Sequence, residues 1–268
     1  MSSSPFYLRG TGLATAADQL DRALNEIATS TGIKRLRAWA LHELRIRHGE
    51  TVVDVGSGNG SYTRRLASCA GPTGRTIGVE LNDGLRRIAV QRANETGSKA
   101  EFTKGDALAL PFRPASVDVV WCERVLQHLD EPDHAVKEIS RVLSPGGRAV
   151  LIDTDWATLV ISPGDPDTVT ALARSAAKYM ANPYSGRKLP GQLTRAGLEV
   201  VDMSSQATMR THRDVRWDSL RKHAERAVEL GLATTTEIDE LINELVRATT
   251  EGTLHCSVTM FAAIARRP

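Results

Sequence analysis

The sequence predicts an α/β fold in which a mostly parallel sheet carries helices on both faces. The first observation is that short apolar runs alternate with amphipathic stretches between residues 51 and 153. This alternation is typical of βαβ units, whose strands are buried on both faces. The second is that Gly56, Gly58 and Gly60 follow the first apolar run, where a strand must turn tightly into a helix. Together they predict a parallel sheet with a ligand site at one edge.

The chain before the first predicted strand is expected to be helical. Residues 1–16 are rich in Ser, Gly and Thr and predict a flexible start. Residues 17–47 predict helix, because apolar side chains such as Leu36 and Leu44 recur at helical spacing. Gly49 ends that pattern.

Five strands and three helices are expected between residues 50 and 153. Asp83 is a plausible N-cap of the second helix, and Gly97 a stop signal for it. The expected strands are 51–55, 75–81, 100–104, 117–122 and 148–153, and the helices are 61–69, 83–96 and 134–143.

The regular alternation ends after Asp153. Four prolines interrupt residues 155–195, around one helical stretch at 167–180. Beyond them the sequence predicts a strand at 198–203, helices within 213–249 and a last strand at 253–266.

Composition and charge exclude several classes of partner. The 268-residue chain carries 34 basic and 32 acidic residues, a net charge of +2, which gives no footprint for nucleic acid or an acidic membrane surface. Its three cysteines are far apart, which fits a reducing compartment. No apolar run has the length of a membrane span or a secretory signal. We therefore expect a cytoplasmic protein with no membrane or nucleic-acid partner.

Acidic residues at the ends of the predicted strands strengthen the case for a nucleotide-like ligand. Glu80 ends the second strand, where a carboxylate can accept hydrogen bonds from both ribose hydroxyls. Asp106 follows the third strand, where it can accept from the exocyclic amine of adenine. Glu123 ends the fourth. The carboxyl ends of parallel strands share one edge, where ligands of open α/β sheets bind.

Five segments resemble, in order and spacing, the motifs of class I S-adenosylmethionine-dependent methyltransferases, most closely those of the ubiquinone/menaquinone-biosynthesis type. The segments are VVDVGSGNG (52–60), GVEL (78–81), GDALALPF (105–112), VDVVWCERVLQHL (117–129) and LSPGGRAVLID (143–153).

The resemblance implies a Rossmann-like, seven-stranded, mostly parallel sheet with an antiparallel last strand and a small helical cap insert. Residues 1–48 would be an N-terminal helical segment covering the active site. Residues 49–268 would form the cofactor-binding domain, with a cap insert at 155–195 and a helical insert at 213–250.

The resemblance also implies the residues that hold the cofactor, S-adenosylmethionine. Glu80 would bind the ribose hydroxyls, Leu81 would pack on the adenine, and Asp106 would bind its amine. Asp54 would steady the glycine loop, and Glu123 would lie near the methionyl chain. The full set implied is Asp54, Gly56, Ser57, Gly58, Gly60, Glu80, Leu81, Asp106, Ala107 and Glu123. Arg35 or Arg37 is a further candidate for the carboxylate of the cofactor.

The acceptor of the methyl group is expected to be a small molecule such as a quinone precursor, a phenol or another secondary metabolite. A hydroxyl acceptor needs a base, and His128 and Asp153 are the leading candidates, ahead of Asp155, His212 and His255. Aromatic residues are scarce, at 4% of the chain, yet several gather around the predicted cap. The candidate pocket walls are Tyr7, Trp156, Tyr179, Met180 and Tyr184, which could equally pack the insert on the sheet.

Alternative readings stay open at this point. A Rossmann oxidoreductase that uses NAD(P) shares the strand, glycine and acid pattern, but G-x-G-x-G is not the dinucleotide spacing. The chain could also bind S-adenosylmethionine without catalysis, or use it for chemistry other than methyl transfer. A homodimer is possible, and no standard metal motif is present in the sequence.

Overall fold

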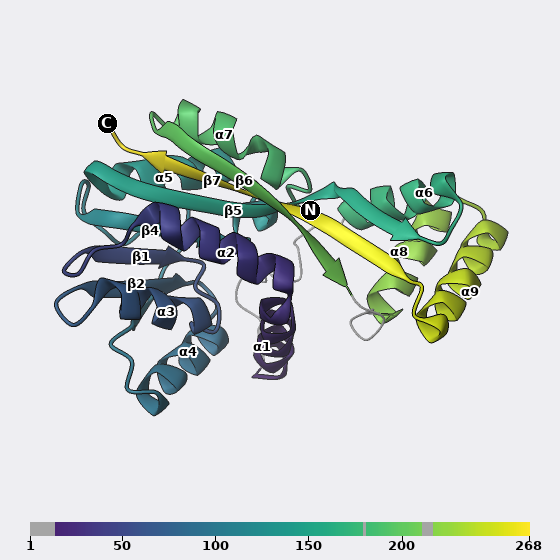
Figure 1. Ribbon diagram of the computed structural model, residues 1–268, viewed down its shortest axis with the longest axis horizontal. Coiled ribbons are helices and arrows are strands. Elements are labelled where there is room, and N and C mark those ends of the chain that lie inside the picture. Colours follow the sequence, from purple (N-terminus) through teal and green to yellow (C-terminus); the bar gives the residue numbers. More distant parts are fainter. Residues whose placement is uncertain (1–13, 179–180, 211–216) are drawn as a thin grey trace.

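The computed structural model describes residues 14–178, 181–210 and 217–268. Its centre is a seven-stranded sheet with the strand order β3-β2-β1-β4-β5-β7-β6 (Figure 1). β7 runs antiparallel to both of its neighbours, whereas the pairs among β1 to β5 are parallel, so the predicted mostly parallel sheet with an antiparallel last strand is confirmed. The strands are β1 (Thr51–Val55), β2 (Arg75–Glu80), β3 (Glu101–Lys104), β4 (Val117–Glu123), β5 (Leu143–Ser162), β6 (Glu199–Arg210) and β7 (His255–Arg266).

Helices cover both faces of the sheet. The side chains of β4 point alternately to these two faces, and each set packs under different helices. Val119 and Trp121 pack into the core beneath two helices of one face, whereas Val120 and Cys122 pack into the core of the other. The helices are α1 (Ala14–Thr29), α2 (Thr31–Leu44), α3 (Ser61–Ala70), α4 (Asp83–Glu95), α5 (Pro132–Val142), α6 (Pro166–Ala177), α7 (Ser185–Arg195), α8 (Trp217–Glu229) and α9 (Thr235–Glu251), with a short 3-10 turn, η2 (Leu126–His128). α2 and α3 lie over the first face, and α5 and α7 over the second.

Three local expectations are corrected. β5 does not end at Asp153 but continues to Ser162, because its outer part pairs with β7. The segment expected to be irregular around its prolines contains α7, with Pro190 inside the helix. The N-cap of α4 is Asn82 rather than Asp83, since its side chain accepts from two backbone amides of the first turn.

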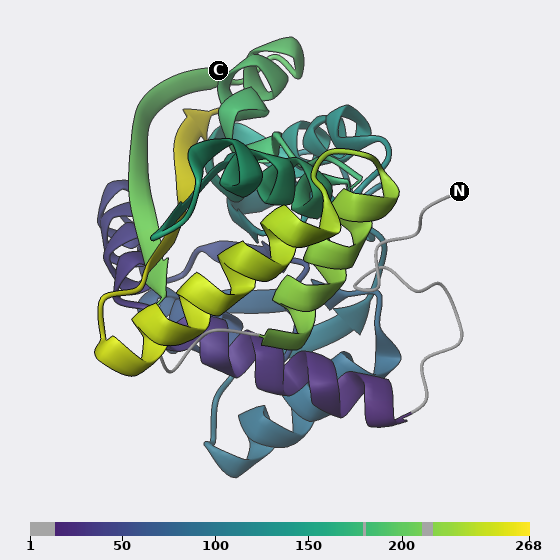
Figure 2. The ribbon, with the colours of Figure 1, turned by 90° about the vertical axis from the view of Figure 1, so that its right-hand side faces the viewer.

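The long strands β5 and β7 extend beyond the rest of the sheet and carry a second group of helices. α6, α8 and α9 pack on these outer ends around a separate apolar core that includes Ile161, Leu172, Leu241 and Leu245. We call α6, α8, α9 and the outer ends of β5 and β7 the distal lobe. Figure 1 shows it at the right of the molecule, and Figure 2 views it end-on. Within the described residues, no helix combines the length and the apolar character that crossing a membrane requires.

Candidate functional site

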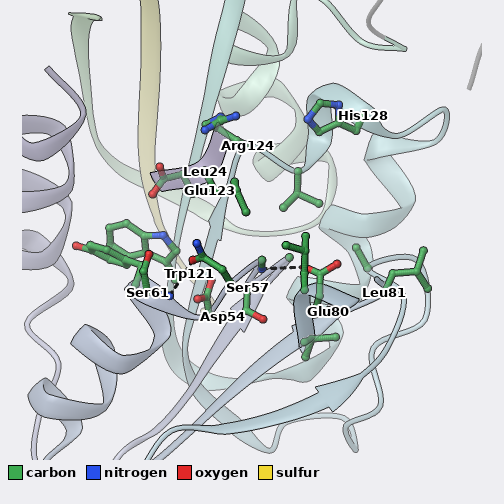
Figure 3. Close-up of a pocket in the computed structure, with 18 of the residues that line it drawn as sticks. Leu24, Asp54, Ser57, Ser61, Glu80, Leu81, Trp121, Glu123, Arg124 and His128 are labelled. Atoms are coloured by element: carbon green, nitrogen blue, oxygen red, sulfur yellow. Dashed lines mark hydrogen bonds between the residues drawn. The ribbon is translucent and has the colours of Figure 1, made fainter. Parts of the chain in front are cut away.

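A cavity lies at the carboxyl ends of β1, β2 and β4, on the edge where the sequence places its acidic residues (Figure 3). It brings together nine of the twelve predicted site residues. These are Asp54, Gly56, Ser57, Gly58, Glu80, Leu81, Ala107, Glu123 and His128. Gly60, Asp106 and Asp153 are not part of the cavity lining.

The glycine loop needs glycine at two cavity positions for steric reasons. Gly56 and Gly58 have φ angles of 70° and 54°, in the left-handed region that side chains disfavour. A Cβ on Gly56 would collide with Val125, and one on Gly58 would come within 2.9 Å of Leu24. At these two positions the loop therefore presents backbone, with no side chain, to whatever occupies the cavity.

Glu80 is fixed at the end of β2 by the loop that it faces. Its two carboxylate oxygens accept from the backbone amides of Gly58 and Asn82, each at 2.8 Å. Burial raises the pKa of Glu80, and these hydrogen bonds oppose the rise by favouring the ionised form. The carboxylate is thus oriented before any ligand arrives, and its remaining lone pairs can accept hydroxyl donors.

The cavity also holds a second acidic group and an ion pair. The Asp54 carboxylate accepts from the Thr63 hydroxyl at 2.6 Å, and burial raises the pKa of Asp54 to about 7. Arg37 from α2 forms a two-point ion pair with Glu123, with N–O distances of 2.8 Å. The same guanidinium lies 4.8 Å from the centre of the Tyr62 ring. Of the two arginines predicted to face the cofactor, Arg37 therefore lines the cavity.

Arg124 and His128 form the opposite end of the cavity, away from Asp54 and Glu80 (Figure 3). Arg124 has a left-handed backbone with φ of 58°, and its amide donates to the Ile152 carbonyl at 2.7 Å. Burial, together with the charge of Arg124, lowers the pKa of His128 to about 3. His128 is therefore neutral at physiological pH and a weak base.

The predicted site residues outside the cavity have local structural partners. Gly60 caps the N-terminus of α3 and packs against Phe102. Asp106 accepts from the Leu108 amide at 2.9 Å, in the turn beside the cavity-lining residue Ala107. Asp153 accepts from the amides of Gln127 and Thr154 and from the Ser185 hydroxyl, at 2.9–3.0 Å.

The other acceptor-site candidates are scattered. Asp155 is ion-paired with Arg187, and His255 bonds to the Ser257 hydroxyl in the distal lobe. The Trp156 indole donates to Gln127, and Tyr184 is 41% exposed. Arg35 is exposed on α2. The remaining candidates, Tyr7, Tyr179, Met180 and His212, lie outside the described residues.

The N-terminal segment was expected to cover the active site, but no residue of α1 was named for it. Leu20 and Leu24 line the cavity from α1, and Asp21 bonds to both Asn59 of the glycine loop and Arg92 of α4. The i, i+4 spacing of Leu20 and Leu24 was the available signal for an apolar face. The partners of Asp21 could not be read from the sequence.

The polar lining suits an extended ligand with hydrogen-bonding groups. Two buried polar atoms of lining residues, Ser57 Oγ and Trp121 Nε1, have no partner among the described residues. The described residues contain no group of three or more His, Cys, Asp or Glu side chains arranged to hold a metal ion.

Comparisons with known proteins match the part of the chain that builds the cavity to methyltransferases. Residues 53–151 match the family model described as a methyltransferase domain. A demethylmenaquinone methyltransferase of Lactococcus lactis is 39% identical over 114 residues, which cover 42% of this chain and 45% of the relative. A 37.1 kDa protein of transposon TN4556 from Streptomyces fradiae, described as uncharacterized, is 29% identical over 248 residues, 91% of this chain and 70% of the relative.

The fold itself is shared with solved structures. The YcgJ protein of Bacillus subtilis superimposes with a TM-score of 0.60 at 20% identity, over 86% of this chain and 97% of that protein. The chain spans only about half the length of the demethylmenaquinone methyltransferases that it matches. The family match over residues 53–151 includes most of the strands and loops that build the cavity.

Proposed function

Since residues 53–151 form a class I S-adenosylmethionine-dependent methyltransferase domain, we propose that this enzyme methylates a small molecule of phenol, quinol or related secondary-metabolite type. The observation that carries the proposal is the Glu80 carboxylate, oriented by the backbone of the glycine loop at the end of β2. A carboxylate fixed there is suited to a ribose, and no lysine stands in the loop to bind phosphate.

Each part of the cofactor would have its own lining residues. Glu80 would accept from the two ribose hydroxyls, Leu81 and Ala107 would pack against the adenine, and Asp106 at the adjoining turn would accept from its amine. The backbone of Gly56 and Gly58 would contact the methionyl part, and Asp54, bonded to Thr63, would steady the loop.

Glu123 lies beside the methionyl chain, where its charge is oriented by Arg37. Two hydrogen bonds fix the Glu123 carboxylate, so it can attract the ammonium group without leaving its place. Leu24 of α1 lines the cavity beside the loop.

The cofactor supplies an electrophilic methyl group on a sulfonium. The protein has to hold the attacking atom in line with the methyl carbon and the sulfur, because orientation supplies much of the rate enhancement in such displacements. Arg124 and His128 border the end of the cavity left for the acceptor. Asp153 fixes the backbone of the η2 turn that carries His128, and so acts as a positioning residue.

The class of acceptor is supported by the relatives, which include a demethylmenaquinone methyltransferase. The indole of Trp156 donates to Gln127 of the η2 turn, next to the cavity-lining His128.

Methyl transfer is tested by incubating the protein with methyl-labelled S-adenosylmethionine and a panel of quinols, catechols and simple phenols. Label in an acceptor, with S-adenosylhomocysteine formed in equal amount, is expected. Glu80→Ala should lose this activity, whereas Glu101→Ala, on the exposed edge of β3, should keep it. S-adenosylmethionine that binds tightly but reacts with no acceptor would favour a non-catalytic binding protein. Formation of 5′-methylthioadenosine instead would show different chemistry on the same cofactor.

A further inference from the structure

The Trp121 indole is a buried hydrogen-bond donor that no described residue satisfies. Trp121 lies on β4, is 1% exposed and lines the cavity. Its Nε1–H has no hydrogen-bond partner among the described residues. An indole N–H can only donate, and a buried donor that stays unpaired costs free energy. A ligand in the cavity can supply the acceptor that the fold does not.

A stack of two further side chains holds the indole in place. The Tyr62 ring lies 4.4 Å from the Trp121 ring, measured between centroids. The Arg37 guanidinium lies 4.8 Å from the centre of the Tyr62 ring, and the Tyr62 hydroxyl donates to the Arg37 carbonyl at 3.3 Å. The indole is therefore oriented by the folded chain, and a ligand that accepts from it does not have to immobilise it.

An acidic side chain stands beside this donor. Asp54 of β1 is in register with Trp121 of β4, so the two side chains point to the same face of the sheet. Both residues line the cavity, and Figure 3 shows them on the same side of it as Ser61, away from Leu81. Thr63 donates to only one oxygen of the Asp54 carboxyl group, Oδ2. One end of the cavity thus offers a donor and an acceptor next to each other.

The arginine in the same stack already has an anionic partner. Arg37 directs Nε and Nη2 at the Glu123 carboxylate, with N–O distances of 2.8–3.1 Å. This ion pair is neutral as a whole, so Arg37 does not place an uncompensated positive charge in the cavity. Asp54 and Glu123 can attract an ammonium group, whereas the Trp121 indole can only donate to an electron-rich oxygen. An α-amino acid carries an ammonium and a carboxylate on one carbon, which matches this pairing.

We propose that the Trp121 Nε1–H donates to the carboxylate of the methionyl end of S-adenosylmethionine, and that this bond makes the site selective for cofactors that carry the carboxylate. The inference rests on the proposed function, because it assigns one residue of that same site. Trp121 is a binding residue that touches the cofactor, and Tyr62 is a positioning residue that acts through it. Trp121 takes no part in the methyl transfer itself.

Selectivity is tested by calorimetry with S-adenosylhomocysteine and its decarboxylated form, which keeps the adenosine and the ammonium. The wild type is expected to prefer S-adenosylhomocysteine, and Trp121→Phe should reduce that preference about tenfold, the usual loss for a hydrogen bond to a charged group. The control is Trp39→Phe on α2, in the same apolar core but not in the cavity lining, and it should leave the preference unchanged. If Trp121→Phe weakened both ligands equally, its role would be structural and the proposal would be overturned.

The hydrogen bond itself is tested in the wild-type protein without any activity measurement. The chain has four tryptophans, so nitrogen–proton NMR spectra of the indole-labelled protein are simple, and Trp121→Phe assigns the signal of interest. Saturation with S-adenosylhomocysteine should move the Trp121 indole proton downfield, as expected for a new bond to a carboxylate. The decarboxylated ligand brings the same adenine ring and should not cause this shift. Equal shifts with the two ligands would contradict the proposed bond.

Asp54→Asn distinguishes the neighbouring acceptor from the indole donor. Both ligands carry the ammonium, so this change should weaken both by a similar factor and keep the preference for S-adenosylhomocysteine. The asparagine oxygen can still accept from Thr63, which preserves the local contact. A preference lost as in Trp121→Phe would contradict the assignment of the carboxylate to the indole. If the wild type bound neither ligand, the proposed function would fail too. If it transferred methyl groups while Trp121→Phe kept the preference, only this inference would fail.

Discussion

The cofactor end of the molecule and the distal lobe are stabilised in different ways. The cavity is organised by hydrogen bonds to backbone and by buried charges, with Glu80 tied to Gly58 and Glu123 to Arg37. The distal lobe has an apolar core around Leu172 and Leu241 on the outer ends of two long strands. The family match ends at residue 151, before that lobe begins. We infer from this difference that the distal lobe can be destabilised without loss of cofactor binding, and the reverse.

The largest expected effect comes from a substitution that destabilises the distal lobe alone. Leu241→Ala removes a side chain that is 3% exposed, and buried leucine-to-alanine changes cost about 2–5 kcal/mol. We expect hydrogen exchange to rise in α6, α8 and α9, while the affinity for S-adenosylhomocysteine changes less than about threefold.

The matched control is Val246→Ala on the same helix, where the side chain is 44% exposed. It should leave exchange in the lobe unchanged. If Leu241→Ala abolished cofactor binding, the two regions would be one cooperative unit and the comparison would fail.

The converse change disables the cofactor end and leaves the lobe folded. Glu80→Ala removes the acceptor for two ribose hydroxyls, and hydrogen bonds to a charged group contribute about 1.5–3 kcal/mol each. Calorimetry should show S-adenosylmethionine binding at least ~100-fold weaker. Glu101→Ala should bind normally, and an undiminished affinity in Glu80→Ala would remove Glu80 from the site.

The buried acid beneath the loop should make stability depend on pH. The pKa of Asp54 is raised from its ordinary 3.8 to about 7, so between these values the folded chain holds a proton that the unfolded chain releases. Stability then falls as pH rises from about 4 to about 7, by up to ~1.4 kcal/mol per pH unit for this group. Burial raises the pKa of Asp153 similarly, so Asp54→Asn should flatten only part of the slope.

Urea unfolding of the wild type and Asp54→Asn between pH 5 and 8 measures this slope. Asp239→Asn, an exposed change on α9, controls for the loss of one charge. Identical slopes for the wild type and Asp54→Asn would show that Asp54 titrates normally.

The smallest expected effect comes from two glycine substitutions, which distinguish the cost of a left-handed backbone from the effect of a new steric contact. Gly58→Ala and Gly97→Ala each force a side chain into a left-handed backbone, which costs about 1 kcal/mol. Only the new Cβ at Gly58 meets another group, Leu24 of α1, whereas Gly97 has open space around it. Both variants should therefore lose similar stability, but only Gly58→Ala should weaken cofactor binding. Equal affinity of the two variants for the cofactor would mean that binding does not require a glycine at position 58.

The sequence located most of the residues that line the cavity, because their signals are local. A strand, a glycine turn and a strand-end acid are recognisable within a few residues, as at Val55, Gly56 and Glu80. Side-chain partners remote in sequence were not predictable. The pair Arg37 and Glu123 is separated by 86 residues, and nothing near either residue indicates the other.

The outer half of β5 was missed for the same reason. Its pairing with β7, such as Val160 with Ser257, depends on a strand almost 100 residues later, so the local pattern after Asp153 suggested irregular chain. Pro190 likewise suggested a break, yet it lies in the middle of α7. The contact between Trp156 and Gln127 could not be predicted either, because only the folded chain brings the two side chains together.

The most direct test of the account is a calorimetric titration of the wild-type protein with S-adenosylmethionine, S-adenosylhomocysteine and NADH. The account predicts that the first two bind with one site per chain and that NADH does not bind. Tight binding of NADH, with no response to either sulfur compound, would contradict the assignment of the cavity and of Glu80 within it.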